Sequence, residues 1–202
     1  MISGKAICVY CSSSDAVASV YFEAARELGH ALAEQGHTLI YGGGNRGLMG
    51  EVARAVHEAG GRVVGVIPEA LMAQHYRQAD ETIVTADMRE RKAAMESRAD
   101  AFIGLPGGFG TLEEVLEILT LKQLRYHNKA IVLANIEGYY SHLAAMFEHL
   151  YEHLFSRSDY RALYYITSSI IDALTYIEAY VPPELPDKWY DPHTSPHNRM
   201  PE

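Results

Sequence analysis

The sequence has too few cysteines for a disulfide framework. Its only cysteines are Cys8 and Cys11, whereas small secreted domains are usually held together by several cysteine pairs. The C-x-x-C spacing also suggests redox or metal chemistry, but residues 6–10 have the composition of a buried strand. A thioredoxin-type pair lies at the start of a helix, and a zinc site needs further ligands close by. We therefore interpret both cysteines as buried structural thiols.

Long apolar runs and an excess of basic residues are absent too. No run approaches the roughly 20 apolar residues that span a bilayer. The N-terminus lacks the apolar core and cleavage site of a signal peptide, so we expect a cytoplasmic protein without a membrane partner. The formal net charge of −9 argues against a nucleic-acid partner, because such surfaces are usually basic. A small anionic ligand stays compatible if local cations and backbone N–H groups bind it.

The sequence does contain a regular alternation of short β-branched runs and longer amphipathic stretches. Its 202 residues, 48% of them hydrophobic, fit one α/β domain. Strands are expected at residues 6–10, 38–41, 62–67, 82–85, 101–105, 130–134 and 165–167. Helices are expected near residues 17–35, 48–59, 88–97, 111–124, 139–154 and 169–180. This alternation predicts an α/β fold with a doubly wound, mainly parallel sheet and helices on both faces.

The domain boundaries follow from the same pattern. Residues 1–181 show no linker or composition break, so we expect a single nucleotide-binding α/β domain. Residues 182–202 are rich in proline and polar residues and are expected to form an irregular tail. Glycines at Gly36 and Gly60 stand where two predicted helices end, as left-handed helix caps require.

Three loops are candidates for ligand binding, because doubly wound sheets bind ligands beyond the carboxyl ends of their strands. The first, residues 11–15, contains serines that suit a phosphate or a sugar and equally suit a capped turn. The second, residues 42–50, begins with three consecutive glycines. A tight turn needs fewer, so we favour a ligand contact at Gly43 and Gly44. Neither a dinucleotide-binding nor a Walker motif is present there.

The third loop, residues 106–111, precedes an apolar pattern that predicts a helix. Free N–H groups and the helix dipole form an anion site at such a start. Thr111 and Glu114 also fit a T-x-x-E capping box, which is a common structural device. Capping leaves the three glycines of the loop unexplained, so we predict a phosphate-binding loop. Its candidate contacts are Gly107, Gly108, Phe109, Gly110, Thr111, Leu112 and Glu113.

The densest positive cluster, residues 88–92, lies just before the helix that leads into the strand at residues 101–105. Most such clusters are solvated helix faces. Because the cluster lies upstream of the predicted phosphate loop, an alternative is that one of its arginines binds the phosphate or the base of a nucleotide.

Together these segments resemble the Lonely Guy family of nucleoside 5′-monophosphate phosphoribohydrolases. The matching segments are residues 41–44, 47–50, 65–68, 88 with 91–92, 106–114 and 135–140. The resemblance implies a Rossmann-like homodimer that hydrolyses the N-glycosidic bond of nucleoside 5′-monophosphates to free base and ribose 5-phosphate. The substrates implied are cytokinin riboside 5′-monophosphates, AMP or both, with no cofactor and no metal.

The resemblance also implies roles for single residues. Arg91 is similar to the catalytic arginine of the family and Glu114 to its catalytic glutamate. Lys92 and Thr120 match ligand-contact positions. His75 aligns where plant members carry a glutamate, so the base preference stays open. A carboxylate near C1′ suits the reaction, because breaking the ribosyl bond develops oxocarbenium-like charge.

Two other functions compete with hydrolysis. A non-catalytic nucleotide-binding or carrier protein on the same fold needs the glycine loops but not Arg91 and Glu114. Lysine decarboxylase, a label often given to this family, needs a Schiff-base lysine in a defined setting, and no lysine of this sequence has one.

Three histidines, His142, His149 and His153, recur seven and four residues apart on one predicted helix. The spacing resembles that of metal ligands, but no H-E-x-x-H motif frames it. We interpret them as surface or interface histidines.

Overall fold

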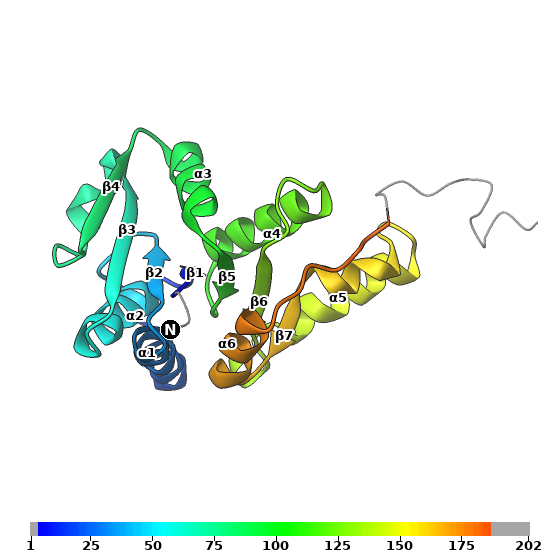
Figure 1. The fold of residues 1–202 in the computed structure, drawn as a ribbon, viewed down its shortest axis with the longest axis horizontal. Coiled ribbons are helices and arrows are strands. Elements are labelled where there is room, and N and C mark those ends of the chain that lie inside the picture. Colours follow the sequence, from blue (N-terminus) through cyan, green and yellow to red (C-terminus); the bar gives the residue numbers. More distant parts are fainter. Residues whose placement is uncertain (1–3, 187–202) are drawn as a thin grey trace, which may run out of the picture.

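Seven parallel strands form one sheet in the order β4-β3-β2-β1-β5-β6-β7 (Figure 1). The computed structural model describes residues 4–186. The strands are β1 (Ala6–Tyr10), β2 (Thr38–Tyr41), β3 (Arg62–Pro68), β4 (Glu81–Thr85), β5 (Ala101–Gly104), β6 (Ala130–Ala134) and β7 (Tyr165–Thr167). The α-helices are α1 (Ser19–Glu34), α2 (Gly47–Glu58), α3 (Met88–Arg98), α4 (Phe109–Gln123), α5 (Ser141–Glu152) and α6 (Ile170–Glu178). Short 3₁₀ segments are η1 (Glu69–Gln74), η2 (Ile136–Gly138) and η3 (Ser158–Leu163).

The strand order reverses at the centre of the sheet. Cys8 of β1 is in register with Ile40 of β2 on one side and with Phe102 of β5 on the other. The pairings among the described strands are all parallel, so the predicted doubly wound sheet is confirmed. The chain leaves β1 and β5 in opposite directions, which opens a crevice beyond their carboxyl ends.

Helices cover both faces of this sheet (Figure 1). Helices α1, α2 and α6 pack on the face to which Ile7 and Val9 point. Helices α3, α4 and α5 pack on the face to which Cys8 points. Cys11 lies in the first of these cores, so the two cysteines face opposite sides of the sheet. Both are buried free thiols, as expected, and burial raises the pKa of each.

Helix ends follow the glycines as expected. Gly36 and Gly60 adopt φ values of +73° and +75° just beyond α1 and α2, where a side chain would be strained. Residues 182–186 contain no helix or strand, as predicted for the tail, and residues 187–202 lie outside the described part of the chain.

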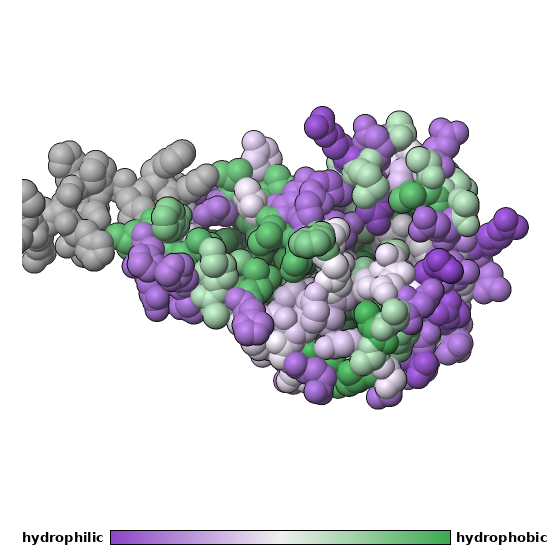
Figure 2. Space-filling model, turned by 180° about the vertical axis from the view of Figure 1, so that it is seen from behind, coloured by the Kyte–Doolittle hydropathy of each residue, from purple (hydrophilic) through white to green (hydrophobic). Residues whose placement is uncertain are grey.

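The surface carries apolar side chains as well as charged ones. Figure 2 shows hydrophilic side chains crowding the rim away from the grey segment, with apolar patches between them. The large apolar side chains that are most exposed include Phe109, Tyr126 and Phe155. Within residues 4–186, no helix combines the length and the apolar character that a membrane crossing requires.

Candidate active site

The three predicted loops meet around one cavity at the carboxyl end of the sheet. Its volume is about 400 Å³. The lining residues are Cys11, Ser12, Ser13, Ser14, Gly42, Gly44, Met49, Ile67, Leu71, Gln74, Met88, Arg91, Gly108, Phe109, Gly110, Thr111 and Glu114. The cavity therefore lies at the reversal of strand order, where the fold predicts a ligand site.

Backbone contacts hold the loops together. The N–H of Ser12 donates to the carbonyl of Pro106 (3.2 Å), and the N–H of Met49 donates to the carbonyl of Ser12 (3.3 Å). The Asp15 carboxylate accepts a hydrogen bond from the N–H of Gly47 at 2.7 Å. Gly47 has φ +58°, and a Cβ there would lie 2.5 Å from the backbone of Ser13. Only glycine permits this close approach of the first two loops.

Helix α4 begins at Phe109, two residues before the predicted start. Gly108 occupies the N-cap position and no side chain caps the helix. Thr111 therefore lies within the first turn, too late to cap, and the T-x-x-E capping box is wrong. The N–H groups of a first turn have no partner inside the helix. Residues 108–111 line the cavity, so the start of α4 lies where its free N–H groups would favour a bound anion.

Two tyrosine hydroxyls donate hydrogen bonds to the loop between β5 and α4. The Tyr139 hydroxyl donates to the carbonyl of Gly107, and the buried Tyr140 hydroxyl donates to the carbonyl of Leu105 at 2.8 Å. Gly107 itself packs against Thr111, since a Cβ at Gly107 would lie 2.1 Å from the threonine Oγ1. The glycine thus makes room for the threonine rather than for a ligand.

The floor of the cavity holds a buried ion pair. Arg91 donates from Nη1 to the Glu114 carboxylate at 2.7 Å and from Nε to the carbonyl of Val66 at 3.1 Å. Arg91 is 7% exposed and Glu114 is 8% exposed. Burial raises the pKa of the Glu114 carboxyl, and the Arg91 guanidinium opposes that rise. The pair combines a fixed cation with a buried carboxylate whose pKa is raised, and such groups are typical of catalytic sites.

The first glycine of the second loop makes this arrangement possible. A Cβ at Gly42 would lie 2.0 Å from Nη2 of Arg91, so only glycine leaves room for the guanidinium. Gly44 lines the cavity beside Met49, so its predicted ligand contact stays a prediction. Gly43 does not line it and packs with φ +73° against Ile67.

Part of the cavity lining is apolar, which the sequence did not indicate. Met49, Ile67, Leu71 and Met88 come from four different elements. Because no local pattern joins such residues, only their arrangement in space reveals the surface. They offer contacts to a flat base or an alkyl group.

His75 is placed beside the cavity rather than in it. Its backbone bridges to Gly44, while its Nε2 lies 2.8 Å from the Thr82 hydroxyl of β4. Burial and the nearby Arg77 lower the pKa of His75. The preceding residue, Gln74, lines the cavity instead.

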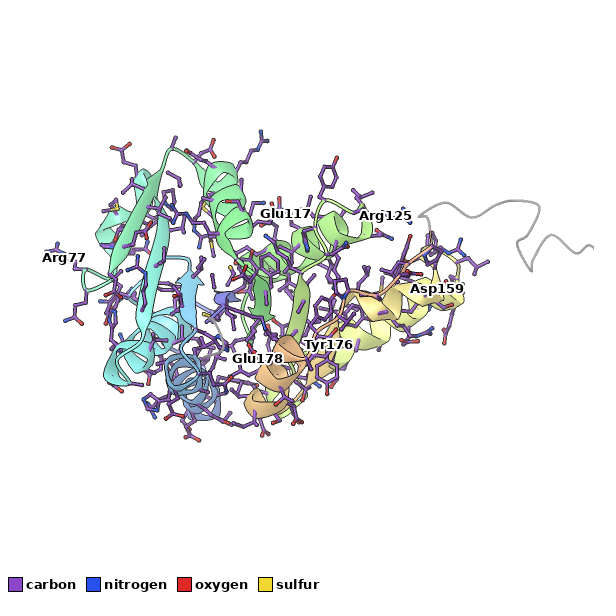
Figure 3. The ribbon with its side chains drawn as sticks, in the orientation of Figure 1. Arg77, Glu117, Arg125, Asp159, Tyr176 and Glu178 are labelled. Atoms are coloured by element: carbon purple, nitrogen blue, oxygen red, sulfur yellow. The ribbon has the colours of Figure 1, made fainter. Side chains whose placement is uncertain are left out.

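Four other predicted contacts lie on the outer face of α4 or next to it. Leu112, Glu113 and Thr120 line a shallow groove on this face. Lys92 forms ion pairs with Glu113 and with Glu117, the latter at 3.0 Å, and Figure 3 shows Glu117 on the side of α4 next to α3. The structure thus divides the predicted contacts between an inner and an outer face of one helix.

Comparison with known proteins shows similarity along most of the chain. The family model described as possible lysine decarboxylase matches residues 49–177. A probable cytokinin riboside 5′-monophosphate phosphoribohydrolase of Oryza sativa subsp. japonica is 42% identical over 181 residues, covering 89% of this chain and 74% of the relative. A second such enzyme of this rice is 40% identical over 201 residues, covering 98% and 82%. One of Arabidopsis thaliana is 41% identical over 180 residues, covering 88% and 79%.

Solved structures share the fold at lower identity. The molybdenum cofactor binding protein of Rippkaea orientalis superposes with a TM-score of 0.68 at 22% identity, covering 89% of this chain and 98% of that one. A molybdenum cofactor carrier protein of Chlamydomonas reinhardtii gives 0.66 at 24% identity, covering 87% and 96%. Identity this low supports the arrangement of strands and helices and nothing more specific.

Proposed function

This chain belongs to the Lonely Guy family of cytokinin riboside 5′-monophosphate phosphoribohydrolases, and we propose that it hydrolyses nucleoside 5′-monophosphates to free base and ribose 5-phosphate. The observation that carries the proposal is the buried pair of Arg91 and Glu114, 2.7 Å apart, in one cavity with the start of α4. Hydrolysis of a nucleotide at C1′ requires a site that binds its phosphate and a carboxylate positioned near C1′. AMP and its N6-isoprenoid derivatives are the proposed substrates, and the cytoplasmic location expected from the sequence stays a prediction.

Each part of the cavity has a proposed role. The phosphate binds at residues 108–111, and the base lies against Met49, Leu71 and Met88 in the apolar part of the lining. Glu114 stabilises the positive charge that develops at C1′ and orients or deprotonates the attacking water. The C–N bond breaks with its electron pair moving to the base, which takes up the proton that the attacking water releases as its oxygen bonds to C1′. Arg91 holds the Glu114 carboxylate in place.

A turnover panel tests this function. Purified protein is incubated with AMP, N6-isopentenyl-AMP, CMP and adenosine, and the released base and ribose 5-phosphate are quantified. Release of both products in equal amounts from at least one monophosphate is expected, with none from adenosine. Tight binding of AMP without turnover of any monophosphate would favour the carrier alternative.

Decarboxylation of lysine finds no support at this site. Among the described residues, no lysine lines the cavity. Lys5 pairs with Glu178, Lys92 pairs with Glu113 and Glu117, Lys122 is buried against the carbonyl of Leu163 and Lys129 donates to that of Glu96. A pyridoxal phosphate enzyme needs a lysine at its reacting centre.

Adding a methyl group at Gly110 tests the phosphate contact separately from folding. A Cβ there meets no atom within 4 Å, and alanine favours the helix by about 0.5–1 kcal/mol, so Gly110→Ala should fold at least as stably as the parent. The Cα–Cβ bond points toward the helix N-terminus, where the phosphate would bind. We expect AMP affinity to fall about 10-fold or more in calorimetric titration.

Adenosine serves as the matched ligand for this variant. It lacks the phosphate, so its affinity should change little on Gly110→Ala. An equal loss for AMP and adenosine, or no loss for either, would place the phosphate elsewhere.

We further propose that the outer face of α4 is covered by a second copy of the chain. Phe109 is 93% exposed and Leu116 is 41% exposed on this face, next to the predicted contacts Glu113 and Thr120. Glu113, Leu116 and Thr120 line the outer groove but not the cavity of their own copy. A homodimer through α4 would bring the outer set to the partner's cavity.

Leu116→Glu tests the dimer. A charge on the outer face of α4 should turn a dimer into a monomer in light scattering and weaken AMP binding at least several-fold. Ile171→Glu is the matched control, since Ile171 is 56% exposed on α6, across the sheet from α4, and this variant should stay dimeric. A monomeric parent protein, or a dimeric Leu116→Glu, would contradict the arrangement.

A further inference from the structure

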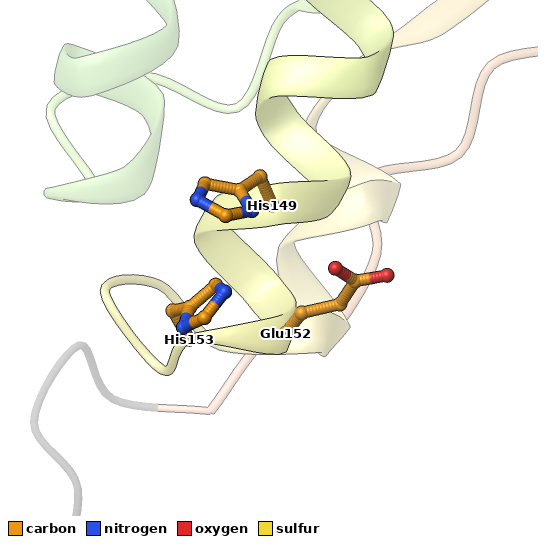
Figure 4. Close-up of side chains that lie close together, drawn as sticks. All are labelled: His149, Glu152 and His153. Carbon is orange, nitrogen blue, oxygen red and sulfur yellow. The ribbon is translucent and has the colours of Figure 1, made fainter.

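The C-terminal end of α5 brings together three side chains that suit a metal ion. His149, Glu152 and His153 each offer one ligand atom, and these three atoms lie within 4.8 Å of one another; Figure 4 shows the three side chains. Two imidazoles and a carboxylate are a donor set that Zn²⁺ and Cu²⁺ favour. We propose that these three residues bind one divalent transition-metal ion, such as Zn²⁺, on the surface of the protein.

The helix fixes the geometry of the two imidazoles. His149 and His153 stand four residues apart, and therefore one above the other on the same side of α5. Their ring centroids are 4.2 Å apart and the rings are tilted by 58°. Glu152 follows His149 by three residues, which is also within reach along the helix. An ion between the rings needs only rotation about side-chain bonds, because the backbone is already in place.

The ligand atoms are available. All three residues are exposed. Within residues 4–186, the two imidazoles and the Glu152 carboxylate form no hydrogen bond and no ion pair. By contrast, His57 lies within 3.0 Å of both Tyr76 and Asp80, so its ring nitrogens are already engaged. The cluster on α5 would lose no protein contact by binding a metal.

Local charge also favours a cation at this position. Helix α5 ends at Glu152, and His153 occupies its C-cap. The C-terminus of a helix carries partial negative charge from carbonyls without an intrahelical partner, which stabilises a nearby cation. The chain turns away at Leu154, which adopts φ +59° and donates its N–H to the carbonyl of Tyr151. This turn leaves the side of the helix that carries both rings open to solvent.

The cluster is separate from the candidate active site. Helix α5 follows β6 and runs antiparallel to it, so its C-terminal end lies at the amino-end side of the sheet (Figure 1). The cavity with Arg91 and Glu114 lies at the carboxyl-end side. A helix of 12 residues is roughly 18 Å long, which separates the two sites. The metal would fasten the end of α5 rather than take part in hydrolysis, and its remaining coordination positions are left for water.

Equilibrium dialysis of the untagged full chain against Zn²⁺ tests the site. We expect one Zn²⁺ per chain and a rise in thermal midpoint on adding Zn²⁺. His149→Ala and His153→Ala should each weaken binding at least about 10-fold, since losing even an outer-shell partner commonly costs 10–100-fold. Glu152→Gln should weaken it less, because one of three ligands changes while the imidazole pair stays.

His142→Ala is the matched control, because His142 is exposed on the same helix, seven residues before His149. This variant should bind Zn²⁺ like the parent. Unchanged affinity in His149→Ala, or an equal loss in His142→Ala, would overturn the site. Because the replaced rings are exposed, all three alanine variants should keep the parent's thermal midpoint without metal, and removal of Zn²⁺ by a chelator should leave nucleotide hydrolysis unchanged.

Discussion

Replacing Glu114 by glutamine should lower kcat for nucleotide hydrolysis by about 10²–10⁴-fold, the usual contribution of one acid–base or electrostatic group. Glutamine keeps the shape of the side chain and still accepts a hydrogen bond from Arg91. It carries no negative charge, however, so it neither stabilises an oxocarbenium-like sugar nor deprotonates water. Nucleotide affinity should stay within a few-fold, because the phosphate contacts at residues 108–111 are unchanged. Single-turnover kinetics with calorimetric titration separates these two quantities.

Glu27→Gln on α1 provides the control for this substitution. Glu27 is an exposed glutamate on the other side of the sheet, and its replacement should leave kcat within about twofold of the parent. Full activity of Glu114→Gln would reduce Glu114 to a structural partner of Arg91. Loss of both binding and turnover would show instead that the carboxylate shapes the cavity.

Local sequence patterns were sufficient for the sheet. Segments such as 130–134 are almost wholly apolar, and in the structure β6 is buried along its whole length. A strand covered by helices on both faces is expected to be a continuous apolar run, so the central strands were recognisable from composition alone. The edge strands β4 and β7 are only partly buried, and their β-branched residues indicated them instead. The start of α4 was harder, because Phe109 and Gly110 carry no helix signal and Gly108 caps the helix without a side chain.

The active-site pair could not be predicted from spacing. Arg91 and Glu114 stand 23 residues apart, on helices separated by β5, and no periodicity relates them. The resemblance to a known family suggested both residues, while their direct contact is visible only in the structure. Gly42 is a similar case, since three consecutive glycines do not reveal that the first one makes room for a guanidinium.

The two faces of α4 were predictable in principle. Glu113 and Thr120 are seven residues apart, and therefore lie on one side of a helix. Glu114 is offset by about 100° from Glu113 and points to the sheet. A family motif lists these residues as consecutive ligand contacts, although the helix places them on different faces. The separation of Glu113 and Thr120 from Glu114 is the reason for proposing a dimer.

The second large effect is expected at Arg91. The guanidinium bonds the Val66 carbonyl and the Glu114 carboxylate at the same time, which a single ammonium group does less well. Arg91→Lys should therefore keep the charge but lose part of this geometry, and kcat/KM should fall by about 10²-fold. The residual activity makes a pH profile measurable.

The direction of the pH effect follows from the charges around Glu114. Hydrolysis needs the ionised carboxylate, so activity falls as the pH drops through the pKa of Glu114. Burial raises that pKa and Arg91 opposes the rise. A weaker partner at position 91 should raise the pKa further, so that Arg91→Lys loses activity at a higher pH than the parent does.

Arg98→Lys is the control, because it changes an exposed ion pair with Glu81 at the end of the same helix. This variant should lose activity at the same acidic pH as the parent. If the acidic limb of Arg91→Lys coincides with that of the parent, Arg91 does not control the charge of Glu114, and its role is confined to positioning that carboxylate.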